Sequence, residues 1–537
     1  MSGEAACDAI VLGAGHNGLI LAAYLGRAGL RVLAVDRAAS AGGGLATIEH
    51  PRGSGFLHNT HAFFQRAITA MPWYADLDLE RHGAHYIEPE LNVALLTRDG
   101  RALEWWTDID RTIGSVEHFN RRDARTLRRW HDEFVPIVRH ILGPESRSPP
   151  LPPAERRRLL ERTPSGRRLL EVSALSPLEF VQREFEDPTV MAGLLFFNGL
   201  REVDLRLRGF GHHIAALIAS PAKAQLSRGG SAAVARALEA AVRESGGDIR
   251  LLTEPSRIVV DGGRAIGVET RNGEMIPARH FVASSLNPHQ TFLELLDPSV
   301  VPGEIRDRAG RFQYNLLAPL FALHLNLHEP PCYSAAATHP ELARAFMTIV
   351  GLDHVDQFFD IIRHHEAGTI PPTVMWGACP TLFDPGQAPE GRDTAFMWEK
   401  VPYRLEGDAA SWDRAKEAHG RALLDVWQGY APNLRDAVVD TFVRSPLDVE
   451  RSLPNMREAD LLVGAFAQDQ VGYHRPFPGA GAYRTHISNL YLCGSCSHPG
   501  GNITGLPGYN AAQVILGDLG LRAEWMPSPI AERLGAL

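Results

Sequence analysis

A glycine-rich turn near the N-terminus restricts the fold more than any other segment. Residues 8–12 predict a short buried strand, GAGHNG follows it, and the apolar-periodic stretch 19–28 predicts a helix. Gly13 permits the tight turn, Gly15 lets the backbone approach a pyrophosphate, and Gly18 lets the helix pack closely on the sheet. The segment therefore predicts a Rossmann-type nucleotide site, with the anion at the helix N-terminus.

An acid at the end of the next strand narrows the choice of nucleotide. Residues 31–35 predict the second strand, and Asp36 follows, where a carboxylate can accept hydrogen bonds from ribose hydroxyls. Arg37 then leads into a second glycine turn that contains Gly43 and Gly44, whose backbone can close over a long cofactor. These features favour FAD over NAD.

The C-terminal part of the chain repeats the pattern of strand, glycine loop and helix. Residues 489–493 predict a strand, a glycine-rich loop begins at Gly494, and 511–516 predict a helix. The positive end of that helix suits the pyrimidine end of a flavin. A glycine-rich surface loop without a ligand is the alternative. The residues that we expect to contact the flavin are Gly494, Ser495, Asn502, Ile503 and Thr504.

Composition excludes several classes of protein. A chain of 537 residues, 45% apolar and 22% charged, is too long for one hydrophobic core, so two interleaved domains are expected. The net charge is −9 and no basic block marks a nucleic-acid site. No apolar run reaches the roughly 18 residues that a membrane helix needs. Five cysteines form no disulfide framework, and we expect a cytoplasmic protein.

The motifs together resemble the phytoene desaturase-like flavoproteins, including the branch named pyridine nucleotide-disulphide oxidoreductase domain-containing proteins. The resemblance rests on GAGHNG with its acid and Gly-Gly, on the segment 229–247, and on the stretch from Asp469 through RPFPG and YRT to LYLCGSCSHPGG. It covers roughly 10–60, 225–300 and 360–520, whereas 100–224 has diverged.

The resemblance implies an α/β fold with two domains. A Rossmann-type FAD-binding domain would be assembled from 1–75, 225–300 and 476–537. An inserted α+β substrate-binding domain, with a mixed or antiparallel sheet, would comprise 76–224 and 301–475. The Pro-rich stretch 143–158 is expected to be a surface excursion of that insert, with a peripheral membrane contact as an alternative role for its arginines.

Two residues depart from the family pattern. Pro255 stands where relatives usually place a valine whose backbone N–H and C=O hold the adenine edge. Proline keeps the carbonyl but has no N–H, so one adenine contact is lost or made by water. Ser495 stands where many relatives have an aspartate that binds the ribityl chain. We expect FAD binding to survive both changes.

The resemblance also suggests candidate catalytic residues. By analogy with the flavin amine oxidase fold, Asn502 corresponds to one aromatic wall of the substrate cage, and Tyr473 or His474 lies near the other. A polar Asn502, with His498 nearby, suggests a polar handle on the substrate. In the alternative, Asn502 and His498 only hydrogen-bond the loop.

The family implies dehydrogenation of a C–C bond in an apolar, terpenoid-like small molecule, with hydride transfer to FAD. Isomerisation and saturation use the same site and stay open. No second GxGxxG unit can hold NAD(P)H, so oxygen or a quinone is the expected electron acceptor.

Other functions remain as alternatives. Amine oxidases of this fold place a lysine near the flavin, and the expected strand 314–327 has none. A flavin-free binding protein and a redox disulfide between Cys493 and Cys496 are further alternatives. The paired histidines lack further ligands at suitable spacing, so no metal site is expected. The sequence leaves the oligomeric state open.

Overall fold

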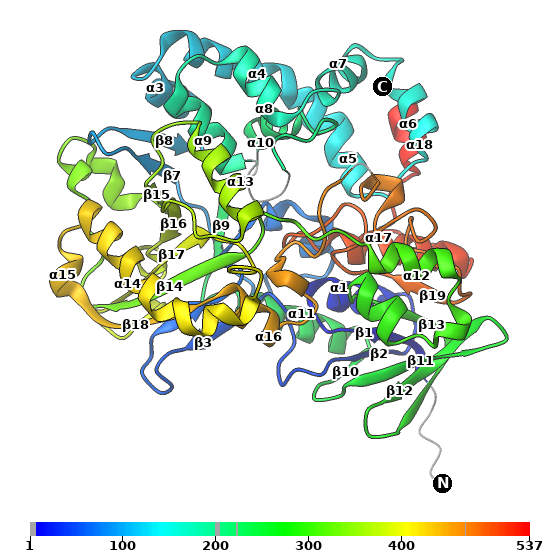
Figure 1. The fold of residues 1–537 in the computed structure, drawn as a ribbon. Helices are drawn as coiled ribbons and strands as arrows, with labels where there is room; N and C mark the ends of the chain where they lie inside the picture. Colours follow the sequence, from blue (N-terminus) through cyan, green and yellow to red (C-terminus); the bar gives the residue numbers. More distant parts are fainter. Residues whose placement is uncertain (1–6, 199–203, 222–223, 468) are drawn as a thin grey trace.

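The computed structural model describes residues 7–198, 204–221, 224–467 and 469–537. Within these ranges, two seven-stranded sheets form the frame of the molecule. In Figure 1 the first sheet lies at the lower right and the second at the left, and helices from the middle of the chain lie above both. The arrangement confirms the predicted α/β fold, in which a Rossmann-type domain carries an inserted substrate domain.

The parallel part of the first sheet joins three distant parts of the chain. Its central strand pairs with one strand from its own N-terminal segment and with one from the middle of the chain, which in turn pairs with a C-terminal strand. In spatial order the parallel strands are β10 (Asp248–Arg250), β2 (Val32–Val35), β1 (Cys7–Leu12), β13 (Met275–Ser284) and β19 (Leu490–Leu492). The antiparallel strands β12 (Arg264–Thr270) and β11 (Pro255–Asp261) extend it.

Helix α1 (His16–Arg27) packs against α11 (Ala232–Glu244) and α17 (Leu506–Asp518) beside this sheet. Every residue of α1 from His16 to Gly26 is buried, as expected for a helix enclosed by its neighbours. The contact with α17 depends on a glycine, because a Cβ atom at Gly508 would lie 2.1 Å from the Asn17 carbonyl oxygen. Backbone contact of this kind holds the two nucleotide-binding segments together.

The second sheet is mixed. Strands β7 and β15 are parallel neighbours, and the other neighbouring strands are antiparallel. In order the strands are β18 (Val438–Arg444), β14 (Leu320–Leu327), β17 (Asp393–Lys400), β16 (Met375–Ala378), β15 (Met347–Val350), β7 (Leu91–Leu96) and β8 (Ala102–Trp106). Helix α14 (Trp412–Tyr430) packs against β14 and β18.

Short strands and helices complete the fold. The small strands are β3 (Thr47–Glu49), β4 (Leu57–Asn59), β5 (Phe64–Arg66), β6 (Tyr86–Ile87) and β9 (Ala224–Ser227). The helices of the diverged region are α3 (Ile109–Glu117), α4 (Arg121–Ile137), α5 (Gly143–Ser146), α6 (Pro153–Leu160), α7 (Pro164–Ser173), α8 (Pro177–Glu184), α9 (Pro188–Asn198) and α10 (His213–Ala219). The remaining helices are α2 (Pro72–Asp76), α12 (Gly303–Gly310), α13 (Gln357–Ala367), α15 (Leu434–Ala437), α16 (Pro446–Ser452) and α18 (Ile530–Gly535).

The Pro-rich stretch 143–158 differs from its predicted role as a surface excursion. It docks on the FAD-binding domain, where Asn510 Nδ2 of α17 donates to the Ser146 carbonyl at 3.0 Å. Gln513 Nε2, one turn further along α17, donates to the Arg147 carbonyl at 3.1 Å, and Ser148 is fully buried. The prolines shape a tight docking segment, which composition alone does not distinguish from an exposed loop.

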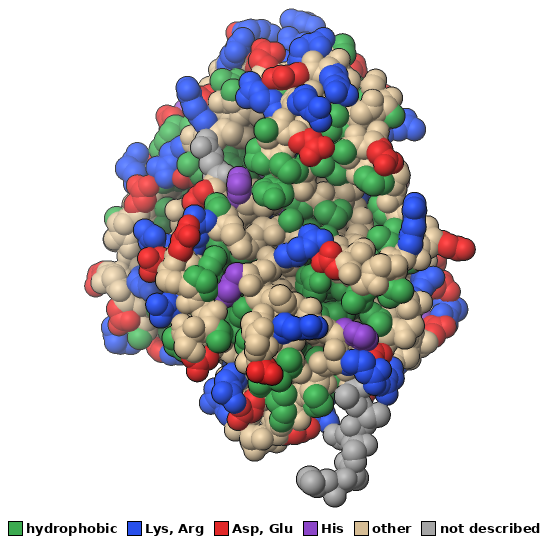
Figure 2. Space-filling view, turned by 90° about the vertical axis from the view of Figure 1, so that its right-hand side faces the viewer, with side chains coloured by type: hydrophobic (Ala, Val, Ile, Leu, Met, Phe, Trp, Pro, Cys, Tyr) green, Lys and Arg blue, Asp and Glu red, His purple; other side chains and the backbone are tan. Residues whose placement is uncertain are grey.

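The surface agrees with the charge pattern of the sequence. On the face in Figure 2, Lys and Arg side chains alternate with Asp and Glu, and hydrophobic side chains gather toward the middle. In the part of the chain that the structure describes, no helix is both long and apolar enough to cross a membrane.

Candidate functional site

The N-terminal glycine turn has the geometry of a phosphate-binding loop. Gly13 has a φ of +89°, and a Cβ there would lie 2.4 Å from Ser285 Oγ. A Cβ at Gly18 would lie 2.1 Å from the Gly13 carbonyl oxygen, so this glycine allows helix α1 to approach the strand. A Cβ at Gly15 would meet nothing within 4 Å. Gly15 therefore faces open space at the N-terminus of α1.

Asp36 ties the end of β2 to the glycine turn. One carboxylate oxygen accepts a hydrogen bond from the Ala14 backbone N–H at 2.8 Å, and the other accepts one from the Ala38 N–H at 2.8 Å. A carboxylate has about four lone-pair sites, so acceptor capacity remains for a pair of ribose hydroxyls.

Asp36 also lines a cavity of about 440 Å³ at one side of the glycine turn. Gly13 and Arg37 are on its wall, and Pro255, at the start of β11, lies opposite them in the sequence-distant segment of the same domain. The size and the carboxylate suit an adenosine group, and the proline carbonyl stays available as an acceptor.

The C-terminal glycine loop is fastened to the N-terminal one. Asn17 Nδ2 donates to Ser495 Oγ at 3.1 Å, and the Asn502 backbone hydrogen-bonds the His16 ring. Burial lowers the pKa of His16 to about 4. A Cβ at Gly494 would lie 2.1 Å from the Ser285 carbonyl oxygen, so this residue also permits a close backbone approach.

Arg475, the arginine of the RPFPG motif, holds the same loop from below. It is fully buried and donates to the Ser495 carbonyl at 3.2 Å. Burial lowers the pKa of its guanidinium to about 10, so the group stays charged at neutral pH. Its other acceptors are the carbonyl oxygens of Gly464, Ala465 and Gln470.

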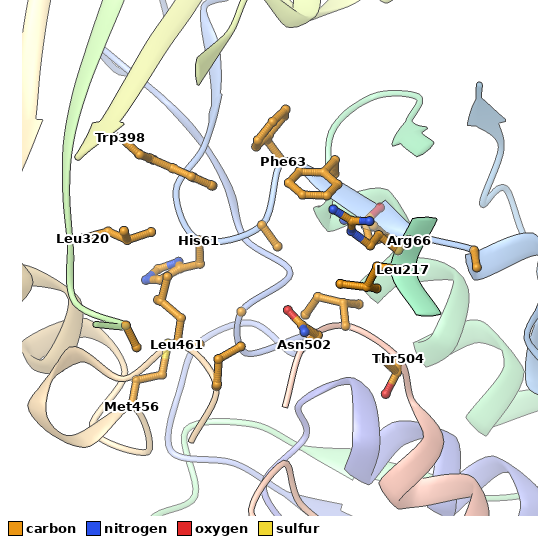
Figure 3. Close-up of a pocket in the computed structure, with 18 of the residues that line it drawn as sticks. His61, Phe63, Arg66, Leu217, Leu320, Trp398, Met456, Leu461, Asn502 and Thr504 are labelled. Atoms are coloured by element: carbon orange, nitrogen blue, oxygen red, sulfur yellow. The ribbon is translucent and has the colours of Figure 1, made fainter. Parts of the chain in front are cut away.

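A second cavity, of about 300 Å³, lies at the other side of the glycine turns. Figure 3 shows Trp398, Leu320 and His61 on one side, Phe63, Arg66 and Leu217 on the other, and Asn502 and Thr504 below. Its wall is mostly apolar, from the second sheet, α10 and the C-terminal loop. Gly44 and Ile503 complete the wall nearest the nucleotide site.

The two cavities and the turn between them fit an extended dinucleotide such as FAD. The polar cavity with Asp36 lies at one end, Gly15 offers its open space between, and the apolar cavity with Asn502 lies at the other end. A side chain at Gly15 would fill that middle space, and only glycine leaves it free.

The structure separates the sequence-predicted catalytic residues. Asn502 lines the apolar cavity with a φ of +74°. His498 Nε2 lies 3.1 Å from the Glu145 carbonyl of α5, and burial lowers the pKa of His498 to about 4. Tyr473 is 39% exposed and, with His474, lies outside the set of cavity-lining residues.

Sequence reasoning missed Lys400. The expected strand 314–327 begins only at Leu320, and Leu320 is the register partner of Lys400 on the neighbouring strand β17. Lys400 is buried, lines the apolar cavity, and donates to the Leu317 carbonyl. Its rarity was the signal, because the chain contains only three lysines.

The remaining sequence candidates have other environments. Cys493 and Cys496 are buried free thiols, and burial raises the pKa of Cys496 to about 11. A neutral thiol is a poor nucleophile, which disfavours a redox role. Within the described ranges, no group of three or more His, Cys, Asp or Glu residues is arranged to hold a metal ion.

Substituting the glycines separates cofactor binding from folding. We expect Gly15→Val to fold with its FAD-free stability unchanged but to retain little FAD, because the added side chain occupies the space for the phosphates. Gly18→Ala should instead lower the free energy of unfolding by roughly 1–3 kcal/mol, because its Cβ meets the Gly13 carbonyl. The flavin-to-protein absorbance ratio and thermal unfolding check both.

Gly114→Val serves as the matched control, since a Cβ on this helix α3 residue also meets nothing within 4 Å. It should keep both the flavin and the stability. A fully yellow Gly15→Val protein would show that the phosphates lie elsewhere.

Comparisons with known proteins agree with this geometry. Residues 11–77 match a family model described as an NAD(P)-binding Rossmann-like domain. A limonene dehydrogenase chain from Castellaniella defragrans is 30% identical, over 98% of this chain and 97% of its own. Pyridine nucleotide-disulfide oxidoreductase domain-containing protein 2 from Rattus norvegicus is 26% identical, over 95% and 94%. A lycopene-forming phytoene desaturase from a Paracoccus species is 24% identical, over 96% and 98%.

Solved structures show the same fold. Cyclohexylamine oxidase from Brevibacterium oxydans aligns with a TM-score of 0.58 and 16% identity, over 96% of this chain and all of that one. The identity over nearly the whole length, together with the nucleotide site described above, leads to one conclusion: the chain belongs to the phytoene desaturase-like family of FAD-dependent oxidoreductases, alongside limonene dehydrogenase.

Proposed function

We propose that this protein dehydrogenates a C–C bond in a compact, largely apolar terpenoid, with FAD as the hydride acceptor. The observation that carries the proposal is the apolar cavity, because it opens on the Asn502 loop where the two glycine turns meet. The names of the relatives point the same way, since one acts on limonene and another on phytoene.

The size of the cavity favours a compact substrate. Its volume of about 300 Å³ is at the low end of the roughly 300–1,000 Å³ of small-molecule pockets. A short or cyclic hydrocarbon fits such a space better than a long linear carotenoid does. The aromatic and aliphatic walls from Phe63, Leu320 and Trp398 bury such a molecule and exclude water from the reacting carbons.

Each part of the site has a proposed role. Gly13, Gly15 and Gly18 hold the pyrophosphate at the N-terminus of α1, and Asp36 binds the ribose. Arg37 and Pro255 bound the adenine. Bound FAD supplies a two-electron acceptor for C–H cleavage. On the substrate side, the Asn502 amide orients a polar group. The further flavin contacts that we propose are Gly43, Gly44, Gly494, Ser495, Ile503 and Thr504.

Amine oxidation is the second candidate because Lys400 lies in the cavity wall. A lysine near the flavin is the feature that the amine oxidases of this fold share, and sequence reasoning had looked for it on the adjacent strand. The apolar lining argues for a hydrocarbon, since a protonated amine would need a carboxylate or an aromatic cage to offset its desolvation.

The electron acceptor that we propose is oxygen or a quinone, because the sequence contains a single GxGxxG unit and that unit serves FAD.

Anaerobic mixing of the oxidised protein with a panel of compounds tests the proposed reaction. The panel contains limonene, phytoene, putrescine and cyclohexylamine, and the readout is the loss of flavin absorbance. We expect limonene-sized terpenoids to bleach the flavin faster than phytoene and both amines. Bleaching by the amines alone would replace the proposal with amine oxidation.

Asn502→Gly tests the orienting role of the loop. Glycine accepts the φ of +74° at this position, so we expect the variant to keep its stability and its FAD. If the amide binds a substrate oxygen, kcat/KM for a terpenoid alcohol should fall by about 5- to 150-fold, the effect of losing a hydrogen bond of roughly 1–3 kcal/mol. The hydrocarbon analogue without oxygen is the matched control, and its kcat/KM should not change. Unchanged kinetics with weaker FAD retention would assign Asn502 to the loop.

A further inference from the structure

Four histidines lead from the apolar cavity to the surface of the protein. His61 lines the cavity, where Figure 3 shows its ring beside Leu320. The others are His324 on β14, His58 on β4 and His50 just after β3. We refer to His61, His324, His58 and His50, in this order, as the histidine row.

The order of the row follows one face of strand β14. Residues two apart on a strand point to the same face, so Leu320, His324 and Asn326 are on one side of the sheet. Leu320 lines the cavity, and Asn326 Nδ2 donates to the His50 carbonyl at 3.0 Å. At roughly 3.3 Å per residue, this face spans about 20 Å between the cavity and the surface.

Neighbouring rings hold the row in place. The His324 ring stacks on Phe442 of β18 at 4.5 Å, and the His58 ring meets the His324 ring edge-on at 5.3 Å. The His50 ring packs on the same Phe442 at 4.2 Å, and His50 Nε2 lies 3.9 Å from the Asp440 carboxylate. The side chains of His50 and Asp440 are 39% and 43% exposed, so the row ends in solvent.

Hydrogen bonds determine the tautomer of His58. Because the Asn326 amide nitrogen donates to a carbonyl, its oxygen must accept, and it lies 2.7 Å from His58 Nε2. His58 therefore carries its proton on Nε2.

The interior of the row contains ring nitrogens without acceptors or donors. Among the residues that the structure describes, His61 Nε2 and both ring nitrogens of the fully buried His324 have no hydrogen-bond partner. Each such atom costs about 1–3 kcal/mol, and a phenylalanine at 324 would fill the same space without that cost. The nitrogens instead give bridging water molecules the polar partners that they need.

Electrostatics keeps the interior of the row neutral. Burial lowers the pKa of His58 to about 4 and of His61 to about 3, and it lowers the pKa of His324 well below its usual value. The nearby Arg444 guanidinium lowers the pKa of His61 and His324 further, whereas Asp440 raises that of His58. A neutral imidazole can accept a proton at one nitrogen and release one from the other, so it passes protons without storing charge.

The proposed dehydrogenation creates a need for such a path. The substrate loses two hydrogens from adjacent carbons. One leaves with both bond electrons to the flavin, and the other leaves as a proton while its C–H electrons form the new C=C bond. An apolar cavity provides no solvent to take that proton.

We propose that His61 Nε2 accepts the proton that the substrate loses, and that the histidine row carries this proton to the surface. The inference rests on the proposed function. His61 is the acceptor at the cavity wall, and the other members act through it. Thr60 Oγ1, 2.9 Å from His61 Nδ1, accepts the Nδ1 proton and leaves Nε2 bare.

The tautomer of His61 is measurable without substrate. In ¹⁵N-histidine-labelled holoprotein, nitrogen chemical shifts distinguish protonated from bare ring nitrogens, and the spectrum of His61→Gln assigns the signals. We expect a neutral His61 at pH 7, with the proton on Nδ1 and a bare Nε2. A charged His61, or a proton on Nε2, would overturn the inference.

Rapid mixing under anaerobic conditions tests proton transfer directly. The substrate is the terpenoid that bleaches the wild-type flavin fastest, and a pH indicator dye reports proton release in the same experiment. We expect His61→Gln to slow bleaching by about 100- to 1,000-fold, the range for losing a general base. Bleaching at the wild-type rate would contradict the proposal.

His324→Phe separates the acceptor from the path. The new ring still stacks on Phe442, so the first bleaching should run within about 10-fold of the wild-type rate, while proton release lags behind it. Simultaneous bleaching and proton release would show that the path does not use the row. His212→Phe is the matched control, because its ring pairs with Ser173 Oγ outside the row, and both signals should stay together.

Folding and function are controlled separately. Each variant is compared with the wild type in melting temperature and FAD content, and His61→Asn replaces His61→Gln if the latter loses FAD. If no terpenoid bleaches the wild-type flavin, the proposed function fails, and the His61 tautomer alone decides the inference.

Discussion

The site depends on the parallel pairing of β13 with β1 on one side and with β19 on the other. Parallel strands present their carboxyl ends at a common edge, so this pairing brings the turns after residues 12, 284 and 492 together. Ser285 shows how close they are, because added Cβ atoms at Gly13 and Gly494 would both collide with it. Without this pairing, the adenosine cavity and the apolar cavity would have no common floor.

The nucleotide half of the site was predictable because its chemistry is local. GAGHNG, Asp36 and the C-terminal glycine loop appear in the sequence at the spacing that the fold requires, and the structure brings them together. Small errors occurred at element ends. Helix α17 begins at Leu506 instead of 511, because Gly505 in a left-handed conformation and Pro507 start it early. The exact domain boundaries stay a prediction.

The substrate half was not predictable because its residues meet only through long-range pairing. Lys400 reaches the cavity through its register with Leu320, and the histidine row forms because β4 lies against β14 and β18. None of these residues stands at a motif-like spacing. The diverged region was equally opaque, since the docking of 143–148 on α17 uses backbone carbonyls that any sequence possesses.

Polar groups in the apolar cavity are the clearest trace of function in this half. Burying imidazoles and a lysine beside tryptophan and phenylalanine opposes folding, and the chain tolerates that cost around this cavity and in the row behind it. Such costs are expected where a reaction must move charge through an environment that excludes water.

A crystal structure of the protein with FAD bound tests the central claim most directly. The account predicts the adenine beside Pro255, the phosphates over Gly15, and the isoalloxazine ring at the edge of the apolar cavity against the Asn502 loop. A flavin ring outside that cavity, or an adenosine away from Asp36, would contradict it.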